Sequence, residues 1–158
     1  MLYMYPYIQA GYRSEWMPML SSHFHHDFTA FLLQLQKAIH EEATAIYFYQ
    51  NLIAMAPKEW HKKWIEHPYK DEKKHLRILS ELYWRITGRQ PVVQAAQTVF
   101  GNYKEGLLKA LESELEAFES YRDLYLATDR ADIRDVLFET MTDEQEHALR
   151  FSFLYHDL

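Results

Sequence analysis

The chain has 158 residues, of which 48% are hydrophobic and 16% aromatic, so it can bury the core of one globular domain and is not disordered. Its 17 Lys and Arg and 23 Asp and Glu give a net charge of −6, which argues against a nucleic-acid partner. The absence of Cys excludes disulfides, thiolate metal sites and cysteine nucleophiles. No apolar run reaches the length of a membrane span and no signal peptide is evident, so we expect no membrane partner and a cytoplasmic location.

The first helical pattern follows an aperiodic segment. Residues 1–26 are rich in Tyr, Met and His, and we predict that they form an arm preceding a bundle over residues 27–158. Asp27 is the predicted N-cap of the first helix, and Pro57 closes that helix or opens the next.

Three further helices are predicted along the rest of the chain. The second extends to about Thr87, with Gly88 as its C-cap and Pro68 as a point where it kinks or restarts. Residues 88–101 have weak periodicity and predict a long connection. A third helix over about residues 102–127 and a fourth after it complete an all-α, antiparallel four-helix bundle, with the crossover between helices 2 and 3.

A repeat relates the two predicted helix pairs. When the sequence is shifted by 72 residues, the unusual residues of the first pair fall on identical residues of the second. Two helix pairs built on one plan imply a pseudo-twofold axis. The identical pairs are Glu42–Glu114, Tyr49–Tyr121, Asp71–Asp143, Glu72–Glu144 and His75–His147.

Acidic and imidazole side chains lie in the apolar seams of all four predicted helices. Any one of them taken alone fits a solvated face or a satisfied core histidine, but the full set does not, because no Lys or Arg occupies a matching seam position. Two divalent cations would balance four carboxylates, and two neutral imidazoles would complete the ligand set. Without metal, some of these acids are expected to take up protons. The predicted metal ligands are Glu42, Glu72, His75, Glu114, Glu144 and His147, with Glu72 and Glu144 as the bridges.

Two further pairs of residues have positions suited to supporting the ligands. Tyr49 and Tyr121 lie seven residues, about 10.5 Å, along their helices from the seam Glu. Across an antiparallel bundle each hydroxyl would reach the ligand Glu of the opposite helix, so we predict both as catalytic residues, with core packing as the alternative. Asp71 and Asp143 are predicted to accept the second ring N–H of the opposing His, with a solvated helix face as the alternative.

The motifs as a set resemble those of the ferritin-like di-iron carboxylate superfamily, including bacterioferritins and rubrerythrins. The resemblance covers about residues 28–155 and implies two iron ions that react with dioxygen or peroxide; oxygen-rich sites with a few imidazoles also suit manganese or zinc. It rests on Glu42 with Tyr49, DEKKH at 71–75, Glu114 with Tyr121, and DEQEH at 143–147.

Departures from these relatives narrow the cofactors and the activity that we expect. Lys73 stands where bacterioferritins have a haem-ligating Met, so no haem is expected. Ala117 stands where rubrerythrins have an additional Glu, and the Cys-rich rubredoxin module of rubrerythrins is absent. Both departures argue against peroxidase activity of the rubrerythrin type, for which electrons would have to come from another protein.

Three functions are compatible with these observations. The first is a ferroxidase or peroxidase-type oxidoreductase that oxidises Fe(II) with dioxygen or peroxide, in iron handling or protection from oxidative stress. The second is a non-catalytic bundle that metal staples together, with an assembly or coat-type role suggested by the N-terminal arm. The third is a metal-free interaction module. A homodimer is expected, with Trp60, Trp64 and Tyr69 as an apolar face.

Overall fold

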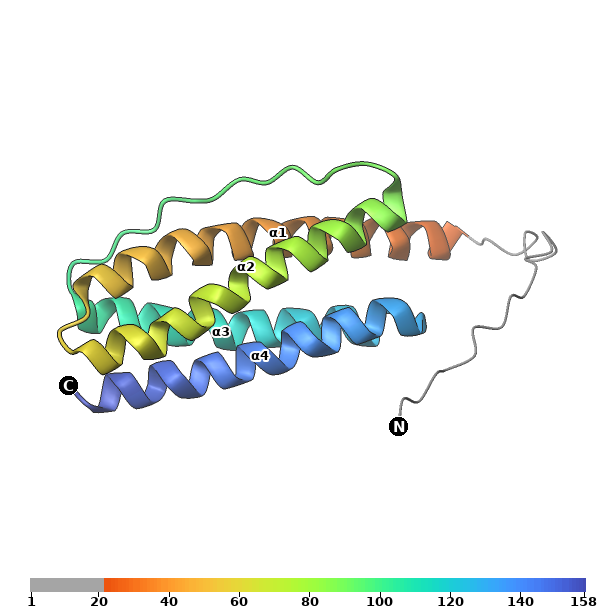
Figure 1. Cartoon of the computed structure of the whole chain (residues 1–158). Helices are drawn as coiled ribbons and strands as arrows, with labels where there is room; N and C mark the ends of the chain where they lie inside the picture. The colour runs from red at the N-terminus through yellow and green to blue at the C-terminus, as the bar shows by residue number, and fades with distance from the viewer. Residues whose placement is uncertain (1–21) are drawn as a thin grey trace, which may run out of the picture.

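The computed structural model describes residues 22–158, which form four helices and no strand. The helices are α1 (Ser22–Met55), α2 (Glu59–Thr87), α3 (Tyr103–Leu126) and α4 (Ala131–His156). Each of α1 and α4 contacts both α2 and α3, so the four helices pack as a square bundle. Figure 1 shows α1 antiparallel to α2, and α3 antiparallel to α4, with the crossover from α2 to α3 running back along the length of α1. The predicted antiparallel bundle with a long crossover is therefore confirmed.

The helix boundaries differ from the predicted ones at the start of α1. The helix begins at Ser22, so the N-cap predicted at Asp27 is wrong. No Gly or Pro occurs between residues 19 and 56, so nothing in the sequence interrupts the helix at Asp27. Most of the predicted arm, residues 1–21, lies outside the described part of the chain.

The boundaries of α2 agree with the prediction. The helix continues through the buried Pro68 without a restart. Gly88 has φ 70° and its N–H donates to the carbonyl of Trp84, which closes the helix in the left-handed conformation that glycine adopts at little cost.

Among the helices of residues 22–158, none combines the length and apolarity needed to cross a membrane.

A ladder of polar side chains on α1 holds the crossover in place. Gln36 donates to the carbonyl of Val92 (2.6 Å), and the N–H of Gln94 donates to His40 Nδ1 (3.1 Å). The N–H of Ala96 donates to the Thr44 hydroxyl (2.9 Å). Four helical residues rise about 6.0 Å and two extended residues about 6.6 Å. Every fourth residue of α1 therefore stays level with every second residue of the crossover.

The apolar core is divided into two clusters, one toward each end of the bundle. Most members of one cluster are related to members of the other by the same shift of 72 residues, as Leu35 is to Leu107 and Leu82 is to Leu154. The pseudo-twofold axis therefore relates the packing of the whole core. The first core cluster contains Phe31, Leu35, Ala38, Ile39, Leu79, Leu82, Tyr121, Leu124, Ile133 and Leu137. The second contains Phe48, Tyr49, Leu52, Ala56, Ile65, Tyr103, Leu107, Ala110, Phe151 and Leu154.

One feature at the second core cluster was not anticipated from the sequence. His61 is fully buried between the Tyr103 hydroxyl (2.9 Å) and an Asp157 carboxylate oxygen (3.0 Å), so it ties together the ends of three helices. Trp60, Trp64 and Tyr69 are half-buried against this cluster, and the homodimer expected from them stays a prediction.

The ladder predicts that replacing Thr44 with Val destabilises the protein by about 1 kcal/mol, because the half-buried hydroxyl that accepts the Ala96 N–H is lost. The matched control is Thr142→Val, since the exposed Thr142 hydroxyl bonds only carbonyls of its own helix. Chemical denaturation measures both. Equal stability losses in the two variants would contradict a role for Thr44 in holding the crossover.

Candidate metal centre

All six predicted ligands lie together between the two core clusters. Each helix contributes one Glu, and α2 and α4 each add a His one turn later, at i+3. Glu42 is 4% exposed, Glu114 3%, and the other four residues 2% or less. The centre of the bundle is therefore a buried layer of four carboxylates and two imidazoles.

These residues form two overlapping groups that could each hold an ion. One group is Glu42, Glu72, His75 and Glu144, and the other is Glu72, Glu114, Glu144 and His147. Within each group the candidate ligand atoms all lie within 4.8 Å of one another. Glu72 and Glu144 belong to both groups, which is the position predicted for bridging carboxylates.

Three carboxylates converge on the Nδ1 atom of each histidine. His75 Nδ1 lies 3.2 Å from Glu144, 3.3 Å from Glu72 and 3.6 Å from Glu42. His147 Nδ1 lies 3.1 Å from Glu72, 3.2 Å from Glu144 and 3.7 Å from Glu114. One ring nitrogen carries at most one proton, so it cannot satisfy three oxygens.

Unpaired oxygen atoms test whether a metal fits this site. Oxygen atoms of Glu42, Glu72 and Glu144 are buried and accept no hydrogen bond. These oxygens lie at ion-pair distance from His75 Nδ1 or His147 Nδ1. The single proton on each of these nitrogens can bond only one of the oxygens around it. Buried carboxylate oxygens without donors are costly, and a divalent cation at each convergence point would satisfy them. The donor set therefore fits two metal ions.

The tyrosine contacts across the bundle are those expected from the repeat. The Tyr49 hydroxyl donates to Glu114, and the Tyr121 hydroxyl donates to Glu42. Both tyrosines are 2% exposed. Each therefore restrains a glutamate on the opposite side of the pseudo-twofold axis while packing its ring into the core.

The aspartate contacts also follow the repeat. His75 Nε2 lies 3.1 Å from Asp143, and His147 Nε2 lies 3.3 Å from Asp71. In a neutral imidazole, donation from Nε2–H leaves the Nδ1 lone pair facing the carboxylates. This is the tautomer in which Nδ1 can bind a metal, so the two aspartates orient both histidines.

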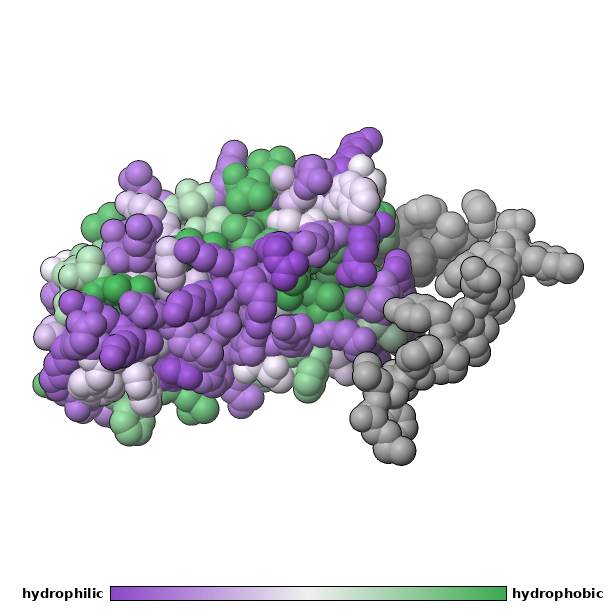
Figure 2. All heavy atoms as spheres, in the orientation of Figure 1, coloured by the Kyte–Doolittle hydropathy of each residue, from purple (hydrophilic) through white to green (hydrophobic). Residues whose placement is uncertain are grey.

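The outer face of α2 and α4 carries further charged residues that the sequence analysis did not assign to the site. Lys74 Nζ lies 2.8 Å from Asp143 and 3.8 Å from Asp71, so one cation contacts both outer aspartates. His67 Nε2 lies 3.2 Å from Glu146. This face is turned to the reader in Figure 2 and is largely hydrophilic. Helix periodicity could not assign Lys74 or His67 to the site, because their partners Asp143 and Glu146 lie on the adjacent helix.

Burial and the convergence of charges shift the pKa values of the site in opposite directions. Burial, then the charges of Glu144 and Glu42, raise the pKa of Glu72 well above 4.5. Burial and Glu144 likewise raise the pKa of Glu114. Burial acts against ionisation of Glu144, but hydrogen bonds from His147 and His75 outweigh it and lower the pKa of that carboxyl.

Both histidines have a raised pKa in the metal-free state. Burial lowers the pKa of His75 and of His147, but hydrogen bonds to the surrounding carboxylates outweigh it. The expected proton uptake therefore holds for Glu72 and Glu114, whereas Glu144 stays ionised because it lies between two imidazolium rings.

Comparison with known proteins places this arrangement in context. No family model matches the chain. The uncharacterized protein YhjR of Bacillus subtilis (strain 168) is 34% identical over 119 residues, which cover 75% of this chain and 82% of YhjR.

Solved structures match the fold at lower identity. A ferritin-like diiron-carboxylate protein from Bacillus anthracis str. Ames matches with a TM-score of 0.71 and 20% identity, over 82% of this chain and 98% of that chain. CopM in its Cu(I)-bound form matches with a TM-score of 0.70 and 12% identity, over 80% of this chain and 96% of that one. The ferritin-like fold inferred from the motifs is therefore confirmed.

The pKa shifts predict how the metal-free protein responds to pH. Glu72, Glu114, His75 and His147 have raised pKa values in the folded state, so above each ordinary value the folded chain binds more protons than the unfolded chain. Stability must then fall as pH rises through the folded values. The lowered pKa of Glu144 removes stability only in acid, below its ordinary value of 4.5.

The measurement is the thermal unfolding midpoint of chelator-treated protein from about pH 5 to about pH 8, over which the midpoint should decline. The decline should be shallower in Glu72→Gln and unchanged in Glu112→Gln, since Glu112 is exposed on α3. A midpoint that rises over this range would refute the assignment.

Proposed function

Because this chain belongs to the family of YhjR and has the ferritin-like fold, we propose that it is a di-metal carboxylate protein that binds two iron ions and oxidises Fe(II) with dioxygen or peroxide. The observation that carries the proposal is the pair of overlapping ligand groups that share Glu72 and Glu144. Shared carboxylates allow two ions to lie close together, as they do in two-metal centres.

The chemistry of the donors supports iron as the metal. Carboxylates with a few imidazoles suit iron, manganese and zinc, and of these zinc has no redox chemistry. Cu(I), the ion bound in the CopM structure, prefers thiolate and thioether ligands, and the six residues offer neither. When bound, iron supplies one-electron steps between Fe(II) and Fe(III), and four such electrons reduce dioxygen to water while two reduce peroxide. An external electron donor is part of the proposal for repeated turnover, because the chain has no Cys to hold a further redox centre.

Side chains around the ligands position them and limit the access of water to the centre. Tyr49 and Tyr121 act through Glu114 and Glu42, so both serve as positioning residues. The two core clusters flank the site and limit the access of water from either end of the bundle.

A non-catalytic metal staple is the second candidate, and one observation favours it. The site takes one Glu from each helix and lies between the two core clusters. One redox-inactive ion in each ligand group would link three helices, and the two ions together would link all four. The assembly or coat-type role attached to this reading rested on the N-terminal arm, most of which lies outside residues 22–158.

Both candidates predict that metal stabilises the fold through the buried carboxylates. At a free ion concentration one hundred times Kd, binding to the folded state alone contributes about 2.7 kcal/mol for each site. Glu144→Ala should lose most of this gain, because Glu144 belongs to both ligand groups, and Glu112→Ala should keep it. Thermal unfolding with and without Zn(II), Mn(II) or anaerobic Fe(II) measures the effect. Equal metal-induced shifts in the two variants would show that Glu144 is not a ligand.

Oxidation kinetics separate the two candidates. Stopped-flow absorbance after mixing anaerobic Fe(II)-loaded protein with dioxygen or peroxide should show faster Fe(III) formation than in Glu144→Ala. Tyr49→Phe should slow the reaction by about tenfold or more, because Glu114 loses the hydroxyl that restrains it. Metal-induced stabilisation without accelerated oxidation would leave the staple and exclude the oxidase.

A further inference from the structure

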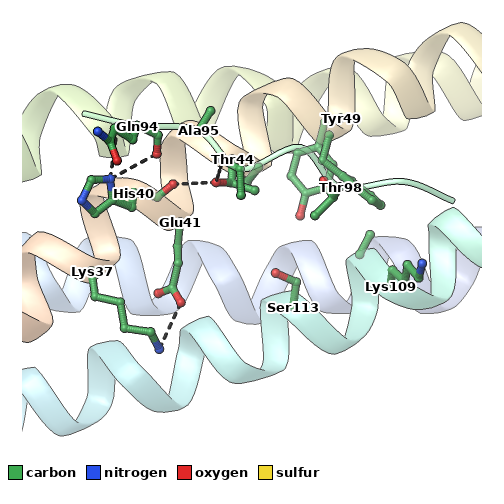
Figure 3. Close-up of a pocket in the computed structure, with 14 residues that line it drawn as sticks. Lys37, His40, Glu41, Thr44, Tyr49, Gln94, Ala95, Thr98, Lys109 and Ser113 are labelled. Carbon is green, nitrogen blue, oxygen red and sulfur yellow. Dashed lines mark hydrogen bonds and ion pairs between the residues drawn. The ribbon is translucent and has the colours of Figure 1, made fainter. Parts of the chain in front are cut away.

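A pocket of about 590 Å³ lies between α1, the crossover and α3. Figure 3 shows Lys37 and Glu41 of α1 facing Ser113 and Lys109 of α3 across it, with Gln94, Ala95 and Thr98 of the crossover along its edge. Because α2 and α4 contribute no lining residue, the pocket is on the side of the bundle opposite the polar outer face. Its volume falls in the range of about 300 to 1,000 Å³ typical of small-molecule sites.

The pocket reaches the metal centre through one side chain. Tyr49 lines the pocket, and its hydroxyl donates to Glu114. Tyr49 is 2% exposed, so a molecule in the pocket can touch only the edge of its ring, and there it would be one hydrogen bond away from a proposed metal ligand. Neither Tyr121 nor Glu42 lines this pocket, so the pocket leads to the half of the pseudo-symmetric centre that contains Glu114.

Small and aromatic side chains form the apolar wall. Ala45 and Ala110 leave space between α1 and α3, and Ala96 of the crossover lies at the edge of the pocket. Phe48 packs against Tyr49 with ring centroids 5.8 Å apart and an interplanar angle of 78°. An aromatic ligand can continue this edge-to-face packing, which gains more than the burial of its area alone.

The charged residues around the pocket are already compensated. Lys37 Nζ lies 3.1 Å from Glu41, and Lys109 Nζ lies 2.8 Å from Glu105. Because both pairs are solvent-exposed and their charges already have partners, they offer a charged ligand little in return for the loss of its own hydration. An uncharged ligand loses no comparable hydration. The Ser113 hydroxyl faces the pocket and has no hydrogen-bond partner within residues 22–158, so it can bind a ligand hydroxyl.

We propose that this pocket binds an uncharged aromatic molecule of the phenol class, with its ring against Phe48 and Tyr49 and its hydroxyl directed toward Ser113. The ligand approaches the centre from the face of α1 and α3, separately from the carboxylates on the face of α2 and α4. Binding depends on the pocket alone and does not require that the centre hold metal.

The test uses 2-naphthol as the probe and the full-length, metal-free protein, with its fluorescence and calorimetry reporting binding. Saturable binding of one probe per chain is expected. Ala96→Leu, which extends a side chain into the pocket, should weaken it at least tenfold, and Ser113→Ala should weaken it about twofold to tenfold through the lost hydrogen bond. The control Ala54→Leu makes the same change at an exposed residue of α1 outside the pocket and should leave affinity unchanged. Circular dichroism confirms that each variant is folded.

A second probe tests the charge argument. The anion 2-naphthoate should bind at least tenfold more weakly than 2-naphthol, and equal or tighter binding would overturn the inference that the ligand is uncharged. Absence of 2-naphthol binding, or binding that neither Ala96→Leu nor Ser113→Ala weakens, would overturn the site. Repeating the titration with Zn(II) present separates this proposal from the proposed function. Probe binding without metal uptake refutes only the metal centre, and metal uptake without probe binding refutes only the pocket.

Discussion

Four buried carboxylates that converge on two imidazole nitrogens are the constraint on which the rest of this structure depends. A layer with this much negative charge is unfavourable in a low-dielectric interior unless cations or protons compensate it. In the metal-free state the histidines become charged and Glu72 and Glu114 take up protons, which leaves Glu144 ionised between two imidazolium rings. Divalent ions held by the two ligand groups would replace that arrangement with one in which all four carboxylates are ionised and both imidazoles are neutral.

The pseudo-twofold axis explains why the layer lies in the middle of the bundle. Each half of the repeat contributes residues to both core clusters, and the polar residues of both halves meet between the clusters. The symmetry is broken outside the ligand layer, on the outer face of α2 and α4 and at one end of the bundle. Lys74, which contacts both outer aspartates, has Glu146 as its counterpart, and the buried His61 has Ile133. These differences make the two candidate ion positions chemically unequal although their ligands are equivalent.

The two sides of the centre also differ in character. On the face of α2 and α4, charged side chains surround the aspartates that orient the histidines. On the face of α1 and α3, the crossover covers a pocket with an apolar wall that ends at Tyr49. The ladder of Gln36, His40 and Thr44 is therefore more than a support for a long connection, because it positions one wall of that pocket.

The sequence by itself determined the number of helices, the crossover and the residues of the central layer, because apolar periodicity specifies which side of a helix faces inward and the 72-residue repeat specifies which inward positions are equivalent. The Tyr49 and Asp143 contacts followed from the same spacing, since each α-helix of an antiparallel bundle has a fixed rise per residue. Only the tertiary structure decided what lies beyond that layer. The position of Lys74, the ionised state of Glu144 and the pocket behind Tyr49 each depend on which side chains of different helices come within a few ångströms of one another. Periodicity along a helix specifies its inward face, but it does not specify the distances between side chains of neighbouring helices that decide these contacts and charge states.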